Sequence, residues 1–222
     1  MIFLKLLSPM GIDFRVYYES AWLVLHGGNP YHGIISTDFP LNYPPPVLLF
    51  IWPLGLLPMS LAGPVFNILS VIAFIVSIWL VLKIAQTKVR APAFVFIVMS
   101  FTLFYFPEKF NVGNGQINNF LLLLVAAGLY FYFAGKKNFS ALLLASASAI
   151  KLAPLVFLLF YLIQRDYRPV VRVLVWLAIL FLLPVIIFGW QFQERYYREI
   201  FWYSITLLWV KNSHQLTSPC SV

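Results

Sequence analysis

The stretch AGPVFNILSVIAFIVSIWLVL, which runs from Ala62 to Leu82, decides the fold of this chain. It carries no charged side chain. A helix of this length, rising about 1.5 Å per residue, crosses a hydrocarbon core roughly 30 Å thick. Basic residues follow it, at Lys83, Lys88 and Arg90. The stretch therefore predicts a transmembrane helix that ends in positive charge.

Apolar runs on both sides of this helix extend the same interpretation. Hydrophobic residues make up 62% of the 222 residues, and the mean hydropathy is +0.88. Long runs favour helices over the short alternating strands of a barrel. We expect an all-α fold, a polytopic bundle of transmembrane helices with broken or re-entrant members, in which 1–222 is a single integral membrane domain. The further expected segments are a short run at 47–58 kinked by Pro53, spans at 92–106, 117–134 and 170–189, a broken span at 139–164, a polar turn at 107–116 and an aromatic interfacial segment at 190–203.

Most of the positive charge, +8 in total, lies in short loops between apolar runs. Cytoplasmic loops of membrane proteins are enriched in Lys and Arg, so this charge indicates orientation and not nucleic-acid binding. The loops that we expect in the cytoplasm are 83–90, 136–137 and 165–172. Residues 107–116 then lie on the far side. The segment 139–164 begins and ends at basic loops, so it must turn back, and Lys151–Pro154 is where it would do so.

A different topology follows if residues 44–58 form a complete span. Strict alternation would then place 85–91 outside and Gly113–Gln116 inside. The charge rule favours the first arrangement, in which 44–58 is either re-entrant or wrongly counted as a span.

Residues 8–43 are polar for this chain, and we expect them to form a long extracytoplasmic loop. Apolar and aromatic residues recur at helical spacing from about 14 to 25, which predicts a short interfacial helix. The sequence begins and ends abruptly, so we also expect a shortened version of a longer membrane protein.

Asp13 stands in this loop just before the aromatic residues Tyr17, Tyr18 and Trp22. A carboxylate placed where a chain leaves the bilayer is costly unless it has a function. One interpretation is a general base. The other is an N-cap for the helix at 14–25, a position that Asp favours.

Lys151 has apolar residues on both sides. It either snorkels to the membrane surface or binds an anionic head group through its ammonium. Gly113–Gln116 is likewise either a turn with a cap or a set of amides for a sugar or a phosphate. We expect no metal site, because the histidines are scattered and there is one cysteine. These residues are His26, His32, His214 and Cys220.

Five short motifs follow one another along the chain: Asp13–Tyr18 (DFRVYY), Gly28–Tyr31 (GNPY), Tyr43–Pro45 (YPP) with Pro53–Leu54, Gly113–Asn118 (GNGQIN) and Ala149–Pro154 (AIKLAP). In this order and spacing, from about residue 11 to 170, the chain resembles glycosyltransferase family 87. These are integral membrane transferases, similar to polyprenyl-phosphate-mannose-dependent α-mannosyltransferases.

The resemblance implies a bundle of the GT-C type, with the catalytic aspartate in the first extracytoplasmic loop. It implies inverting transfer of a sugar, with mannose the first candidate, from a polyprenyl-phosphate donor to a lipid or glycan acceptor, at the outer face of the plasma membrane and without a cofactor. Asp13 would be the general base, and Lys151 would stabilise the leaving phosphate. The residues expected around the substrates are Arg15, Tyr17, Tyr18, Asn29, Tyr31, Asn114 and Gln116.

The alternative function is that of a membrane protein without catalysis, either a lipid carrier or a subunit of a complex. A transferase predicts a polar cavity on one face that reaches both Asp13 and Lys151. A scaffold predicts that these two residues lie apart.

Overall fold

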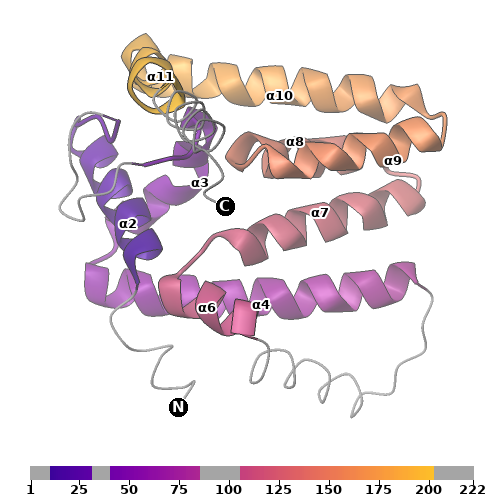
Figure 1. The fold of residues 1–222 in the computed structure, drawn as a ribbon, viewed down its shortest axis with the longest axis horizontal. Helices are drawn as coiled ribbons and strands as arrows, with labels where there is room; N and C mark the ends of the chain where they lie inside the picture. The colour runs from indigo at the N-terminus through magenta and orange to yellow at the C-terminus, as the bar shows by residue number, and fades with distance from the viewer. Residues whose placement is uncertain (1–10, 32–40, 86–105, 203–222) are drawn as a thin grey trace, which may run out of the picture.

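The computed structural model describes residues 11–31, 41–85 and 106–202, and these residues form helices and no strand. The predicted all-α class is therefore confirmed. Four long helices lie side by side as a row (Figure 1). In spatial order they are α4 (Met59–Ile84), α7 (Asn118–Phe133), α8 (Lys137–Ile150) and α10 (Tyr167–Phe188).

Two helices of the row are long and apolar enough to cross a membrane. α4 and α10 contain 26 and 22 residues, which correspond to about 39 and 33 Å at about 1.5 Å per residue. They confirm the spans predicted at 62–82 and 170–189. α7 covers the span predicted at 117–134 and pairs with Glu108–Asn114 across a bend of 120°, as a broken or re-entrant span. Of the span predicted at 92–106, residues 92–105 lie outside the described residues.

The predicted break in the segment 139–164 is confirmed at Lys151. α8 ends at Ile150, and the backbone of Lys151 is extended (φ −147°, ψ 133°). The chain continues through a 3₁₀ helix, η3 (Ala153–Phe157), into α9 (Leu158–Ile163). Pro154 lies in the first turn of η3, where its missing N–H is not needed.

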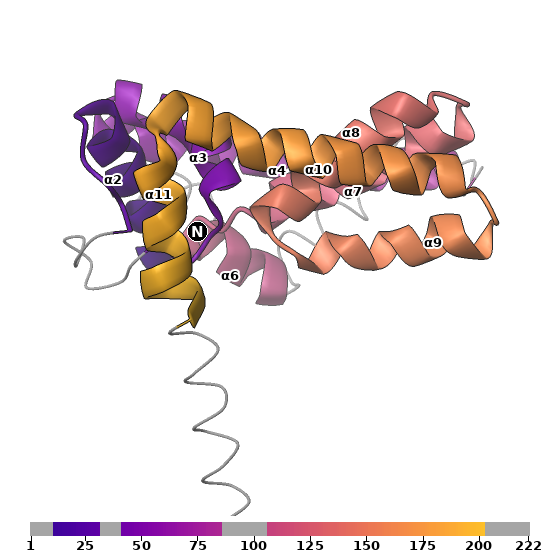
Figure 2. The ribbon, with the colours of Figure 1, turned by 90° about the horizontal axis from the view of Figure 1, so that it is seen from above.

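α8 is buried between α7 and α10 because its side chains are small. Ala141, Ala145 and Ala149 are fully buried, and small residues let membrane helices approach closely. Lys137 at the start of α8 forms an ion pair with Asp166, which follows α9. The two arms of the α8–α9 hairpin therefore return to the same end of the row (Figure 2).

Residues 44–58 do not form one continuous helix. They break into η1 (Pro45–Val47), α3 (Leu48–Ile51) and η2 (Trp52–Leu56), and Pro53 lies in the first turn of η2. The segment is too short to cross a membrane and packs beside α2 (Ile12–Leu25) and one end of α10. The complete span of the alternative topology is therefore not formed.

The polar turn predicted at 107–116 is wrong, because most of this segment is a helix, α6 (Phe106–Asn114). The buried carboxylate of Glu108 on α6 has a partner on a neighbouring helix. The Asn119 Nδ2 of α7 donates to Glu108 Oε1 at 2.7 Å and to Ser70 Oγ of α4 at 3.0 Å. Satisfied in this way, a polar side chain can be buried on a helix. The turn itself is limited to residues 115–117.

The two ends of the row differ in character. α2, which starts two residues before the predicted interfacial helix, and α11 (Trp190–Arg195) lie at one end (Figure 1). α11 continues into a π-helical turn, η4 (Tyr196–Phe201), and turns away from the direction of α10 (Figure 2). The opposite end holds the C-terminus of α4 and the α7–α8 and α9–α10 turns (Figure 1). The described residues of the three basic loops thus share one end, far from Asp13, whereas Lys88 and Arg90 lie outside the described residues.

Candidate active site

The first turn of α2 is fixed against the end of α6 and against α4. The Gly11 N–H donates to the Gly113 carbonyl at 3.3 Å. A Cβ on Gly11 would lie 2.5 Å from the Asn114 Cα, so only glycine allows this approach. One turn along, the buried ring of Phe14 packs on Phe66 with a centroid distance of 5.4 Å. These contacts fix the position of Asp13, which lies between them in sequence.

Asp13 does not cap α2. The N-cap residue is Gly11, and no side chain caps this helix end. Asp13 instead lies in the first turn, half-buried, with its Oδ2 accepting a hydrogen bond from Gln116 Nε2 at 2.9 Å. The capping alternative is therefore wrong, and the carboxylate faces the turn between α6 and α7.

The turn that delivers Gln116 is a Schellman motif. Gly115 has a φ of +66°, a left-handed conformation that glycine adopts without strain. The Gln116 N–H donates to the Asn111 carbonyl at 2.9 Å, and the Gly115 N–H donates to the Val112 carbonyl at 3.2 Å. The sequence GNGQ thus ends α6 and directs the Gln116 side chain to Asp13.

A chain of hydrogen bonds continues from Gln116 to Lys151. Asn118 Nδ2 donates to Gln116 Oε1 at 2.8 Å. Lys151 Nζ donates to Asn118 Oδ1 at 3.4 Å. Two amides therefore connect Asp13 on α2 to the lysine that follows α8, whereas the pocket that Asp13 lines does not include Lys151. Asn118 was missed by the sequence analysis.

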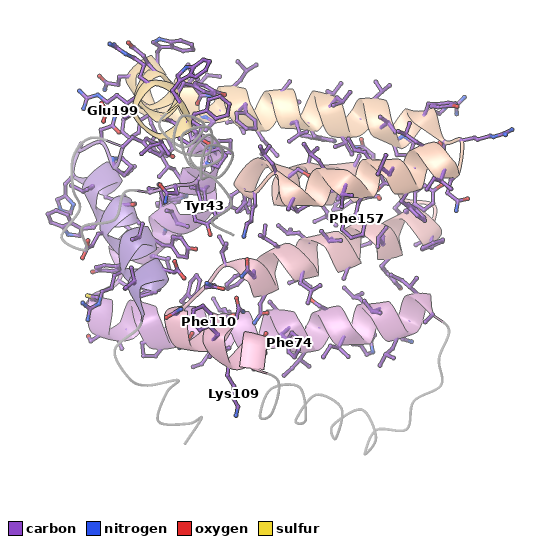
Figure 3. All side chains as sticks on the ribbon, in the orientation of Figure 1. Tyr43, Phe74, Lys109, Phe110, Phe157 and Glu199 are labelled. Atoms are coloured by element: carbon purple, nitrogen blue, oxygen red, sulfur yellow. The ribbon has the colours of Figure 1, made fainter. Side chains whose placement is uncertain are left out.

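A polar pocket of about 260 Å³ opens beside Asp13. Its lining residues are Ile12, Asp13, Val16, Tyr17, Asn42, Tyr43 and Asn114. The Tyr17 hydroxyl donates to the Tyr43 hydroxyl at 2.9 Å, so the proton of Tyr43 points elsewhere. Tyr43, labelled in Figure 3, comes from the segment that leads into η1. Burial raises the pKa of Tyr17 well above its ordinary value and also raises the pKa of Tyr43, so both phenols are neutral hydrogen-bonding groups.

Five of the predicted substrate-binding residues lie outside the lining of this pocket, and one of them, Gln116, contacts Asp13 directly. Arg15 is exposed on α2. The Tyr18 hydroxyl donates to the Leu57 carbonyl at 3.0 Å and ties α2 to the end of η2. Asn29 Oδ1 accepts from the Tyr31 N–H at 3.0 Å, and the fully buried Tyr31 donates its hydroxyl proton to the Tyr43 carbonyl at 2.9 Å. Tyr31 thereby positions Tyr43, which the sequence analysis did not select as a site residue.

A second, apolar pocket of about 370 Å³ lies next to the hydrogen-bond chain. Ile117 and Ile150 belong to its wall, and they are the direct neighbours in sequence of Asn118 and Lys151. The remaining lining residues are Phe50, Ile51, Pro53, Leu54, Phe66, Leu69, Phe120, Leu123 and Leu124. The lysine therefore stands where an amide network meets a hydrocarbon-lined space. Within the described ranges, no three His, Cys, Asp or Glu residues group as metal ligands would.

Comparisons with known proteins agree with the resemblance. The chain matches glycosyltransferase family 87 over residues 41–218. It is 30% identical over 208 residues to a polyprenol-phosphate-mannose-dependent α-(1-2)-phosphatidylinositol mannoside mannosyltransferase of Mycobacterium tuberculosis, covering 86% of this chain and 48% of the relative. The protein of the same description in Mycolicibacterium smegmatis is 29% identical over 182 residues, covering 74% of this chain and 41% of the relative.

The matches also have limits along the chain. The chain spans less than half the length of the curated relatives that it matches. The family match begins at residue 41, so Asp13 lies before it. No solved structure matches the chain at a significant level.

Proposed function

The chain belongs to glycosyltransferase family 87, and from this we propose that it transfers mannose from a polyprenyl-phosphate donor to a lipid-linked glycan acceptor. The names of its relatives specify polyprenol-phosphate-mannose as the donor and a phosphatidylinositol mannoside as the acceptor. The observation that carries the proposal is the hydrogen-bond chain that joins Asp13 to Lys151 through Gln116 and Asn118. It links a candidate base to a cation that could hold the donor phosphate.

Asp13 is the general base in this proposal. It removes the proton from an acceptor hydroxyl, and that oxygen forms a bond to the anomeric carbon of the donor sugar. The bond from the anomeric carbon to the phosphate oxygen breaks at the opposite face, so the configuration inverts. The hydrogen bond from Gln116 engages Oδ2, which leaves Oδ1 to face the acceptor. The neighbouring polar pocket, with Tyr43 and Asn114 in its lining, is the proposed acceptor site.

Lys151 holds the leaving group. The lipid phosphate departs as an anion, and an ammonium placed at that oxygen stabilises the developing charge. Lys151 is exposed and has two further N–H donors beside the one that it gives to Asn118. The apolar pocket next to it, with Ile150 and Ile117 in its wall, suits the first isoprene units of the lipid.

The reaction takes place at the outer face of the plasma membrane in this proposal. Lys83, Lys136 and Arg165 lie near the helix ends opposite α2, and the positive-inside rule assigns such an end to the cytoplasm. Cysteines introduced at Asn114 and Lys137 should be labelled by an impermeant reagent from opposite sides of intact cells, Asn114 from outside. Labelling of both from one side would contradict this orientation.

A transfer assay tests the function itself. Membranes that contain the protein should move labelled mannose from polyprenyl-phosphate-mannose to a lipid-linked mannoside, and membranes without it should not. The anomeric configuration of the product, compared with that of the donor by NMR, tests inversion. A protein that binds the donor lipid in these membranes but never releases free polyprenyl phosphate would instead be a lipid carrier.

A further inference from the structure

We infer that Asn118 is a positioning residue that holds the Gln116 amide in the one orientation that favours an ionised Asp13. Lys151 at one end of the chain thereby prepares the base at the other end. The inference rests on the proposed function, because it concerns how that same site is organised.

The orientation of each amide follows from the groups at the two ends. A lysine ammonium can only donate, and an ionised carboxylate can only accept. Lys151 therefore requires the Oδ1 of Asn118 to face it, which turns Nδ2 toward Gln116. Gln116 must then present Oε1 to Asn118 and Nε2 to Asp13, as the structure has it. With the Lys151 ammonium at one end and the Asp13 carboxylate at the other, each amide both donates and accepts a hydrogen bond within the chain.

A carboxylate in place of Asn118 would reverse this order. The new carboxylate would accept from Lys151 and also from Gln116 Nε2, so the Gln116 amide would rotate and present Oε1 to Asp13. Two acceptors then face each other unless Asp13 is protonated. A glutamate in place of Lys151 would reverse the chain from its far end by the same logic, turning first Asn118 and then Gln116.

Among the residues that the structure describes, few other charges adjoin Asp13, so a change in its titration can be assigned to the reversed amides. Tyr17 on α2 and Tyr43 before η1 are neutral phenols, and Arg15 is exposed. α3 and η2 contain no ionisable residue, and Lys83, the one charged residue of α4, lies at its far end. On α6, Glu108 accepts a hydrogen bond from Asn119, and Lys109 points away from the bundle (Figure 3). Further described polar neighbours of Asp13 are the neutral amides of Asn42, Asn114 and Gln116.

Infrared titration of the Asp13 carboxyl in lipid nanodiscs is the test. The carboxyl band of Asp13 is identified by subtracting the spectrum of Asp13→Asn. Asn118→Asp should raise the titration midpoint of Asp13 by about one pH unit, the effect of exchanging a donor for an acceptor at a carboxylate. Lys151→Glu should raise it in the same direction, and its exposed position makes it the variant more certain to fold. Asn118→Leu, which releases the Gln116 amide without reversing it, should raise the midpoint by less than Asn118→Asp does.

A double-mutant cycle separates the amide chain from a simple charge effect. In a Gln116→Leu background the amide is gone, so neither Asn118→Asp nor Lys151→Glu should move the midpoint further. A shift of equal size in that background would mean that the new charge acts through space, and the inference would be wrong. It would also be wrong if both variants titrated like the parent.

The infrared result is independent of sugar transfer. Absence of transfer by the parent protein would overturn the proposed function and leave the titration to decide the role of Asn118. With transfer established, Asn118→Asp should regain activity above its shifted midpoint. A folded Asn118→Asp protein that stays inactive at every pH would contradict a positioning role.

Discussion

The two ends of the helix row each hold a carboxylate and a lysine, but they arrange them differently. At the basic end, Lys137 donates directly to Asp166, and Tyr132 adds a hydrogen bond at 3.3 Å. The hydrogen bond from Lys137 lowers the pKa of Asp166. At the α2 end, Asp13 and Lys151 are held apart by the amides of Gln116 and Asn118.

The difference indicates what each end is built to do. A carboxylate paired directly with an ammonium is a weak base, because its charge is neutralised within the protein. Such a pair serves to join two segments of the chain. The Lys137–Asp166 pair closes the α8–α9 hairpin in this way. Charges that are separated by neutral amides keep their orientation but remain available to a substrate.

The largest expected effect distinguishes the two carboxylates. Asp13→Asn should lower the transfer rate by roughly 10²- to 10⁴-fold, because the amide keeps the shape of the side chain but accepts no proton. The matched control, Asp166→Asn at the other end, should leave transfer within a few-fold of the parent. Mannose incorporation at equal protein levels measures both. Near-normal activity of Asp13→Asn would remove the base assignment.

The second-largest effect should separate Lys151 from Lys137 in their influence on donor kinetics. Lys151→Met keeps the bulk of the stem but loses a charge-assisted contact to the phosphate, which corresponds to about 2 to 4 kcal/mol, or roughly 30- to 1000-fold in kcat/KM for the donor. Lys137→Met should leave donor kinetics unchanged. Lys151→Arg should recover only part of the loss, because a planar guanidinium differs in shape from an ammonium. Equal donor kinetics for Lys151→Met and the parent would return Lys151 to a snorkelling role.

The smallest effect concerns stability at the basic end. The folded-state pKa of Asp166 is lowered from the ordinary value of 3.8, so its contribution is fully present above about that pH and is lost as the pH falls through the lowered value. The parent should therefore melt at a higher temperature than Asp166→Asn near neutral pH. The gap should narrow below about pH 4. A gap that does not change with pH would show that the ion pair does not carry the difference.

Much of the fold could be predicted from the sequence because run length and proline position act locally. The span at 62–82 and the break at Lys151 follow from an uninterrupted apolar run and from Pro154. α6 could not be predicted, because the composition of PEKFNVGNG favours a turn. Its buried Glu108 accepts a hydrogen bond from Asn119 on α7, a contact that the local sequence does not reveal.

The candidate site could be predicted only in part, for the same physical reason. Lys151 is conspicuous as a charge among apolar residues, and Asp13 as a carboxylate just before a group of aromatic residues. Asn118 is an ordinary amide at a helix start, and its role appears only when residue 151 is brought beside it. Tyr43 belongs to the YPP motif, but its place in the pocket depends on hydrogen bonds with Tyr17 and Tyr31.

The most direct test introduces at the α2 end the direct lysine–carboxylate pair that is found at the basic end. Gln116→Lys would place an ammonium on Asp13, as Lys137 does on Asp166, and Gln116→Met is the uncharged control of similar bulk. Mannose transfer by Gln116→Lys should fall at least about 100-fold below that of Gln116→Met, since a directly paired carboxylate is a poor base, while thermal stability is kept. Transfer by Gln116→Lys within a few-fold of the control would contradict the claim that the separation of Asp13 from Lys151 is what makes this end catalytic.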